Sequence, residues 1–278
     1  MCKRFVMISQ EQHGPVACLH QGRRLLGLFP PFMTVRCYCV DGLMIDSGLG
    51  AFAARTLEWA RAQGAGRAVL THHHEDHSGG ASDLRRGGLP VWASAATAER
   101  IHRGFSTYLY QRLVWGRAPE VRVEILPGEV ETERYRFQVL PAPGHCDDQV
   151  VLYEPGQGWL FSGDAFLNEK IRYFRGDEDF DATLDSLRRL SRLDFDKLFC
   201  AHRPRLQAGR QSLERKLQFL LDLQGRVREL HARGLPPREI TRRLLGREPW
   251  LLYLFSAGDL SKYNLVRSIL YGPRARRA

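Results

Sequence analysis

The feature that most constrains this fold is a series of short apolar runs that each lead into a histidine or an aspartate. Residues 67–70 lead into THHHEDHSGG at 71–80, a segment with four histidines and an acidic pair. A rigid strand end at the edge of a sheet can hold a metal ligand, so these runs predict strands that end at a common site. Three later runs end in the same way, at His145, Asp164 and His202.

Strand geometry distinguishes between the histidines of the first segment. In an extended strand end, His72 and His74 point to one side and His73 points to the other, so the outer two are the expected ligands of one ion. Once the chain bends, Asp76 and His77 face a different direction, which suits a second, neighbouring ion. A cluster of histidine with carboxylate favours zinc or a similar divalent ion.

The rest of the chain alternates strand-like and helix-like segments in two halves. We expect strands at 35–40, 43–47, 67–71, 90–94, 121–126, 135–142, 149–154, 158–164 and 197–202. We expect helices at 51–63, directly after Gly80, from about 95, and at 183–193. Each half has strands followed by helices, which predicts an α/β (α+β) fold of two packed sheets with helices outside.

The chain beyond Pro204 is predicted to be helical. A break at 234–237 (GLPP) separates a long helix from shorter ones at 238–245 and 260–270. We therefore expect a catalytic domain at 1–208 and a C-terminal helical extension at 209–278. The apolar face of the long helix runs through Leu213, Leu217, Leu220, Leu221, Val227 and Leu230.

Composition narrows the class of protein. A chain of 278 residues suits one catalytic unit, and its 41 Lys and Arg against 31 Asp and Glu give a net charge of +10. That charge is spread widely, so it supports acidic partners only weakly. The N-terminus lacks a secretory apolar segment, and no stretch approaches the roughly 20 apolar residues of a membrane span. We therefore expect a cytoplasmic protein with no membrane partner.

The cysteines are expected to be reduced, because a chain of this size needs no disulfides. Cys37 and Cys39 share one face of a strand but lie too far apart along it to form a bridge. Cys146 and Cys200 stand beside candidate ligands and are expected to pack in the core. The six cysteines are Cys2, Cys18, Cys37, Cys39, Cys146 and Cys200.

Taken together, these motifs resemble the metallo-β-lactamase superfamily. The H-x-H-x-D-H motif of that family matches His72, His74, Asp76 and His77, and its closing histidine matches His202. Its G-H and S-G-D motifs match Gly144-His145 and Ser162-Gly163-Asp164. The resemblance runs from about residue 30 to 205, in family order, and is closest to the glyoxalase II-like hydrolases.

The resemblance implies a four-layer αββα sandwich with a dinuclear metal site at one edge. The first ion would be held by His72, His74 and His145, the second by Asp76, His77 and His202, and Asp164 would bridge them. Zinc is the expected metal, with iron or manganese as alternatives. A metal-bridging hydroxide would attack an ester, thioester or lactone, and Asp76 would also hold the proton of that nucleophile.

Departures from the family pattern leave the substrate open. His145 is followed by CDDQ and His202 by RPR, and no glutathione-binding portion is recognisable from Arg210 onward. One alternative is an RNA or phosphodiester nuclease, favoured by the excess of basic over acidic residues and by a C-terminal module that could be a degenerate winged helix. A persulfide dioxygenase-like enzyme with one iron and a non-catalytic metal-binding effector are further alternatives. The oxygen-reducing diiron branch generally has glutamate where this chain has His74.

Basic residues near the ligands predict a small or medium-sized anionic substrate rather than nucleic acid. Arg172, Arg203 and Tyr108 are the candidate substrate contacts, and a homo-oligomer is possible. The aromatic residues could form an apolar wall or simply pack under the following strands. The expected cations are Lys170, Arg172, Arg175, Arg203 and Arg205, and the aromatic stretch holds Phe105, Tyr108, Tyr110 and Trp115.

Overall fold

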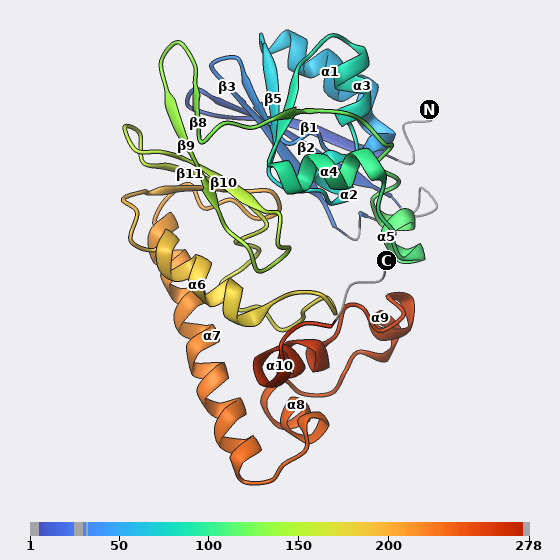
Figure 1. Ribbon diagram of the computed structural model, residues 1–278, viewed down its shortest axis with the longest axis vertical. Helices are drawn as coiled ribbons and strands as arrows, with labels where there is room; N and C mark the ends of the chain where they lie inside the picture. Colours follow the sequence, from blue (N-terminus) through green and yellow to red (C-terminus); the bar gives the residue numbers. More distant parts are fainter. Residues whose placement is uncertain (1–5, 25–29, 32, 275–278) are drawn as a thin grey trace.

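The computed structural model describes residues 6–24, 30–31 and 33–274. Two β-sheets pack face to face, and helices cover their outer faces (Figure 1). The C-terminal helices gather beneath the second sheet in this view. This arrangement confirms the predicted two-sheet α/β sandwich.

The first sheet has seven strands in sequence order. Its first four strands pair antiparallel, and the strands from β4 to β7 pair parallel. Asp41 and Gly42, which join β3 to β4, both have positive φ angles, of 49° and 79°, as a tight two-residue hairpin requires. The strands are β1 (Val6–His13), β2 (Val16–Arg23), β3 (Val35–Val40), β4 (Leu43–Ile45), β5 (Arg67–Leu70), β6 (Val91–Ala93) and β7 (Glu124–Ile125).

Six helical segments of the described residues connect the strands of this half. Three of them, α1, α3 and α4, pack on the outer face of the first sheet through residues such as Trp59, Leu84 and Ile101. The short α2 lies within the histidine segment and carries Asp76 and His77. The segments are η3 (Gly50–Phe52), α1 (Ala53–Ala62), α2 (Glu75–Ser78), α3 (Ala81–Arg86), α4 (Ala95–Arg103) and α5 (Leu109–Val114).

The second sheet has five strands in the order β12-β11-β10-β9-β8. Helix α6 (Phe180–Leu190) connects β11 to β12, which pair parallel, and the other neighbours pair antiparallel. Strands β8 and β9 form a hairpin at the edge of this sheet. The strands are β8 (Glu129–Glu131), β9 (Arg136–Pro141), β10 (Val150–Glu154), β11 (Trp159–Gly163) and β12 (Lys197–Cys200).

Between the sheets lies an aromatic core. Phe161 and Phe199 stack with ring centroids 4.7 Å apart, and Tyr38 meets both rings edge-on. All three side chains are buried, as is Phe137. Because this core fixes both sheets against each other, the strand ends at its edge form a rigid platform for functional side chains.

The C-terminal segment shares the core of the second sheet. Leu213, Leu220 and Val227 of α7 (Gly209–Ala232) are buried together with residues of β10, β11, β12 and α6. The predicted boundary at residue 208 stays a prediction. The later helices are α8 (Pro237–Leu245), α9 (Trp250–Phe255) and α10 (Lys262–Tyr271).

Several elements differ from the sequence-based expectation. The β1–β2 hairpin, α2, β8 and α9 were not expected, and the strand expected at 121–126 covers only Glu124–Ile125. Helix α6 begins before the expected residue 183, because the side chain of Asp179 accepts a hydrogen bond from the backbone N–H of Ala182 and caps the helix.

The cysteines of the described part are buried free thiols, as expected. Cys2 lies outside the described residues. Among the helices that the structure describes, none combines the length and apolar character needed to cross a membrane.

Candidate metal centre

Seven imidazole and carboxylate side chains meet at one edge of the sandwich. They come from the loop after β5, helix α2, the loop between β9 and β10, and the ends of β11 and β12. The chain turns sharply from α2 into α3 there, and Gly79 and Gly80 allow the turn because a Cβ on Gly80 would lie only 2.4 Å from the carbonyl oxygen of Ser47. The seven are His72, His74, Asp76, His77, His145, Asp164 and His202.

Three histidines form the first group. Nε2 of His72 and Nε2 of His145 each lie 3.0 Å from Nδ1 of His74. A tetrahedral zinc ion with bonds of 2.0–2.1 Å places its ligand atoms about 3.3 Å apart. Both distances from Nδ1 of His74 are therefore close to the spacing that one such ion requires.

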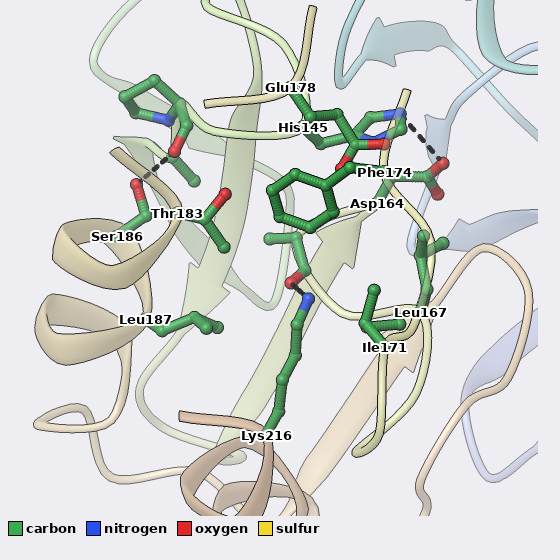
Figure 2. A pocket seen from close by; sticks show the side chains of 13 residues that line it. His145, Asp164, Leu167, Ile171, Phe174, Glu178, Thr183, Ser186, Leu187 and Lys216 are labelled. Atoms are coloured by element: carbon green, nitrogen blue, oxygen red, sulfur yellow. Dashed lines mark hydrogen bonds and ion pairs between the residues drawn. The ribbon is translucent and has the colours of Figure 1, made fainter. Parts of the chain in front are cut away.

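Two carboxylates and two histidines form the second group. Nε2 of His202 lies 3.5 Å from Oδ2 of Asp76 and 3.4 Å from Oδ2 of Asp164. Nε2 of His77 lies 3.6 Å from Asp76 and 3.4 Å from Oδ1 of Asp164. Oδ2 of Asp164 is also 3.4 Å from Nε2 of His145 (Figure 2). Together with its contacts to His77 and His202, this places the carboxylate between both groups.

The cluster contains buried polar atoms that no protein group satisfies. Nε2 of His77 and Oδ1 of Asp164 are buried and have no hydrogen-bond partner among the residues that the structure describes. An unsatisfied buried polar atom costs about 1–3 kcal/mol, which a bound cation would offset. The donor set, its spacing and these atoms all fit divalent metal ions.

Contacts behind the ligands orient the rings. Oδ2 of Asp46 accepts a hydrogen bond from Nδ1 of His77 at 2.8 Å, and Oδ1 accepts one from the backbone N–H of Thr71 at 2.8 Å. Nδ1 of His202 donates to the carbonyl oxygen of Thr34 at 2.5 Å. Because each Nδ1 carries the proton, the lone pair of each Nε2 faces the second group.

Burial and charge affect the candidate ligands differently, also within the first group, where burial opposes a charge on His145 but Glu178 and Asp164 outweigh it and raise the pKa of His145. Burial lowers the pKa of His72 and of His74 well below the usual value, so both rings are neutral. Burial also opposes a charge on His77, but nearby carboxylates outweigh it and raise the pKa of His77 well above its usual value. Asp164 is buried as well, yet His202 and His77 hold its pKa well below the usual value. Without a metal, protons on the histidines of the second group thus balance the negative charge of its carboxylates, and a bound cation would displace these protons.

His73 lies on the other side of the segment, as strand alternation predicts. Its Nδ1 lies 2.9 Å from Oδ1 of Asp148, and its backbone N–H donates to the same carboxylate. Asp148 also accepts from Thr97 and from Arg100, both at 2.8 Å. His73 therefore belongs to a buried polar network outside the seven-residue cluster.

Arg175 contacts a candidate ligand from behind. Its Nη1 lies 3.0 Å from Nε2 of His74. A guanidinium group only donates, so Nε2 accepts and a neutral ring then carries its proton on Nδ1. Nδ1 is the atom that faces His72 and His145. A metal ion at Nδ1 therefore requires the contact between Arg175 and His74 to open.

Arg175 also connects the centre to the C-terminal segment. Its Nε lies 3.5 Å from Oδ2 of Asp259, and the same oxygen accepts a 2.6 Å hydrogen bond from the hydroxyl of Tyr110. Glu75 lies next to this network and is buried, which raises its pKa to about 7. Helix α5, the loop after β11 and the chain after α9 thus meet at one buried cluster of charges.

A cavity of about 490 Å³ opens over the seven-residue cluster. Four of the five predicted cations border it: Lys170, Arg172, Arg175 and Arg203. Arg205 instead places its guanidinium over the ring of Phe166.

The predicted aromatic wall divides between two pockets. Tyr110 and Trp115 border the large cavity, whereas Phe105 and the predicted contact Tyr108 border a neighbouring pocket with His73.

A second, smaller cavity of about 20 Å³ lies behind Asp164 (Figure 2). Lys216 of α7 reaches into this region, and its Nζ donates to the carbonyl oxygen of Ala165 at 2.7 Å. Burial lowers the pKa of Lys216 to about 8. The long C-terminal helix therefore supports the loop that carries Asp164.

Sequence reasoning did not identify several of these residues. Asp46 follows the apolar strand β4, so the same strand-end signal that identified Asp164 could have found it. Leu252 belongs to WLLYLF, an apolar run in a charged tail, and this contrast in composition could have identified it. Lys216 and Asp259 carry no signal of this kind, because their roles depend on contacts with distant segments.

Comparison with known proteins gives a consistent family. The model of the family described as "Metallo-beta-lactamase superfamily" matches residues 34–202. A protein of Legionella pneumophila (strain Lens) named hydroxyacylglutathione hydrolase is 33% identical over 141 residues, which are 50% of this chain and 48% of that protein. A protein of the same name from Rhodobacter capsulatus is 31% identical over 186 residues, 65% of this chain and 64% of that protein. The chain thus spans about half the length of the first relative.

Solved structures share the fold at lower identity. A metallo-beta-lactamase from Pontibacter korlensis superposes with a TM-score of 0.61 at 21% identity, covering 78% of this chain and 99% of that one.

Proposed function

Because the chain belongs to the metallo-beta-lactamase superfamily, a group of metal-dependent hydrolases, we propose that it hydrolyses an ester, thioester or lactone with two divalent metal ions. The observation that carries this proposal is the pair of donor groups that share Asp164. Seven donors are more than one tetrahedral ion uses. Zinc is the first choice of metal, with iron and manganese as alternatives.

In this proposal His72, His74 and His145 would hold one ion. Asp76, His77 and His202 would hold the second, and Asp164 lies where it could serve both. When bound, such ions lower the pKa of a coordinated water to about 7 and polarise the carbonyl group of the substrate. Asp76 borders the large cavity as well as the second donor group, so its carboxylate is available to take the proton of the attacking water.

Two observations support a small anionic substrate. The relatives named hydroxyacylglutathione hydrolase favour a thioester, and cations border the cavity over the cluster. The same cations make phosphodiester hydrolysis the second candidate, and several phosphate contacts would then give a steep dependence of binding on salt. The cytoplasmic location and the oligomeric state stay predictions.

The test combines metal analysis with a matched pair of variants. Metal-loaded protein should contain two ions per chain and should turn over members of a panel of esters, thioesters and lactones. His74→Ala should lose one ion and its activity. His73→Ala should retain both ions per folded chain, since its side chain contacts Asp148 instead. A single tightly bound iron would support the dioxygenase alternative, and equal metal loss in both variants would refute the ligand assignment.

A further inference from the structure

The wall of the large cavity is mainly apolar, although its floor is charged. Three separate segments supply the apolar side chains: α5 and the residue after it, the loop after β11, and the chain from α9 onward. Tyr110 and Trp115 are buried, so they present a fixed surface. A fixed apolar wall of this size favours an apolar group of the substrate. The side chains are Tyr110, Trp115, Leu167, Ile171, Leu252 and Leu260.

The mouth of the cavity carries positive charge that the protein leaves unpaired. Lys170, Arg172 and Arg203 are exposed and border the cavity. Within the part of the chain that the structure describes, none of the three has an ion-pair partner within 4.0 Å. Arg175, deeper in the cavity, is by contrast engaged by Asp177 and Asp259. The exposed cations therefore suit an anionic group that stays at the mouth.

Helix α9 continues the apolar wall to the outside. Its side chains Leu251 and Leu254 are 65% and 66% exposed, whereas Leu252 on the same helix borders the cavity. The ring of Phe255 lies 5.9 Å from that of Tyr110, so α9 and α5 flank the mouth together. An apolar chain entering the cavity would thus meet apolar surface along its path.

We infer that the substrate is amphiphilic: an ester or thioester with an apolar acyl group in the cavity and a negatively charged portion at the mouth. The inference rests on the proposed hydrolase function and adds the substrate class to it.

The test is a series of thioesters that vary one half at a time. Acetyl-, hexanoyl- and dodecanoyl-coenzyme A vary the apolar half, and kcat/KM should rise about fourfold per added methylene until the cavity is filled. Hexanoyl-glutathione and hexanoyl-N-acetylcysteamine vary the charged half. Compared with hexanoyl-coenzyme A, which carries phosphate groups, the glutathione thioester carries carboxylates and the N-acetylcysteamine thioester carries no charge. The uncharged thioester should be the poorest of the three hexanoyl substrates.

Two variants of α9 provide a matched pair for the apolar half. Leu252→Asn should lower the ratio of hexanoyl to acetyl turnover at least about fivefold, because it places an amide in the wall. Leu251→Asn makes the same change on the exposed face and should leave that ratio unaltered. For the charged half, Arg172→Ala should raise KM only for the charged thioesters. Arg205 lies outside the cavity, so Arg205→Ala should leave KM for these thioesters unchanged.

Binding without turnover separates this inference from the proposed function. The thioethers ethyl- and hexyl-coenzyme A lack the scissile carbonyl, and calorimetry with metal-free protein should show tighter binding of the hexyl compound. If no thioester is turned over but binding of the thioethers still depends on chain length, the hydrolase function alone is overturned. Equal turnover of acetyl and hexanoyl thioesters, with equal binding of both thioethers, would overturn the amphiphilic substrate and leave the hydrolase function standing.

Discussion

The floor of the large cavity and its mouth are held in place by different means. At the floor the candidate ligands are largely buried, and partners such as Asp46 and Thr34 fix the orientation of His77 and His202. At the mouth Arg172 and Arg203 are exposed. The geometry of the floor is therefore determined by many contacts, whereas that of the mouth is determined by few.

The two regions also come from different parts of the chain. The floor is built from strand ends up to residue 202, and the mouth adds Leu252 and Leu260 from the C-terminal segment. This difference teaches that the C-terminal segment contributes to the mouth and not to the floor, although Arg203 of the mouth directly follows His202 of the floor. Substitutions at the floor should affect every substrate, and substitutions at the mouth should affect some.

The largest expected effect tests the floor. Asp164→Ala should lower kcat/KM for every substrate by about a thousandfold, because it removes the carboxylate that faces both donor groups. Metal content and turnover on acidic and neutral esters would be measured together. A loss confined to one class of substrate would break the distinction between floor and mouth.

The next effect tests whether α7 supports the floor. The folded protein holds the pKa of Lys216 at about 8, below the usual 10.5, so the unfolded chain binds more protons between these values. The free energy of unfolding should therefore rise by up to about 3 kcal/mol as the pH rises from about 8 to 10.5.

Denaturant titrations across that pH range would measure this rise. Lys216→Met, which fills similar space without a charge, should remove it. An identical pH profile in the variant would show that Lys216 is not held in its buried position behind Asp164.

A smaller effect concerns the support of one ligand. Asp46→Asn should weaken binding of the second metal ion by about 10- to 100-fold, since the neutral amide no longer polarises Nδ1 of His77. Competition with a chelator would measure the affinity, and the first ion should be retained. Loss of both ions at similar chelator concentrations would argue that the two donor groups act as one.

The smallest effect tests the mouth. Arg203→Ala should raise KM for anionic substrates by at most about fivefold, because an exposed ion pair contributes about 0.2–1 kcal/mol. Kinetics at low and high salt would measure it, and the difference from the unaltered protein should vanish at high salt. An equal change in KM for a neutral ester would show that Arg203 acts through packing rather than charge.

Local patterns predicted the floor well. Alternation along the strand end placed His72 and His74 on one side and His73 on the other, and the structure has this arrangement. The runs before Asp164 and His202 form strands, as their apolar composition indicates. These features depend on neighbours in the sequence, so the sequence reveals them.

The mouth could not be predicted in the same way. The six apolar residues of α9 are too short a run to distinguish a helix from a strand by periodicity. The position of α9 beside α5 depends on a contact between Phe255 and Tyr110, which lie far apart in the chain. Arg175 was expected among the cations near the ligands, and it does border the cavity, but its ion pairs with Asp177 and Asp259 depend on segments that the sequence pattern does not connect.

Asp46 leaves little choice of amino acid at its position. Its backbone φ of 62° lies in the left-handed region, which glycine, asparagine and aspartate tolerate best. Only aspartate among these three brings the carboxylate that accepts hydrogen bonds from Thr71 and His77. The identity of this one residue in a related chain is therefore a simple sequence marker of whether that chain keeps the carboxylate that orients His77.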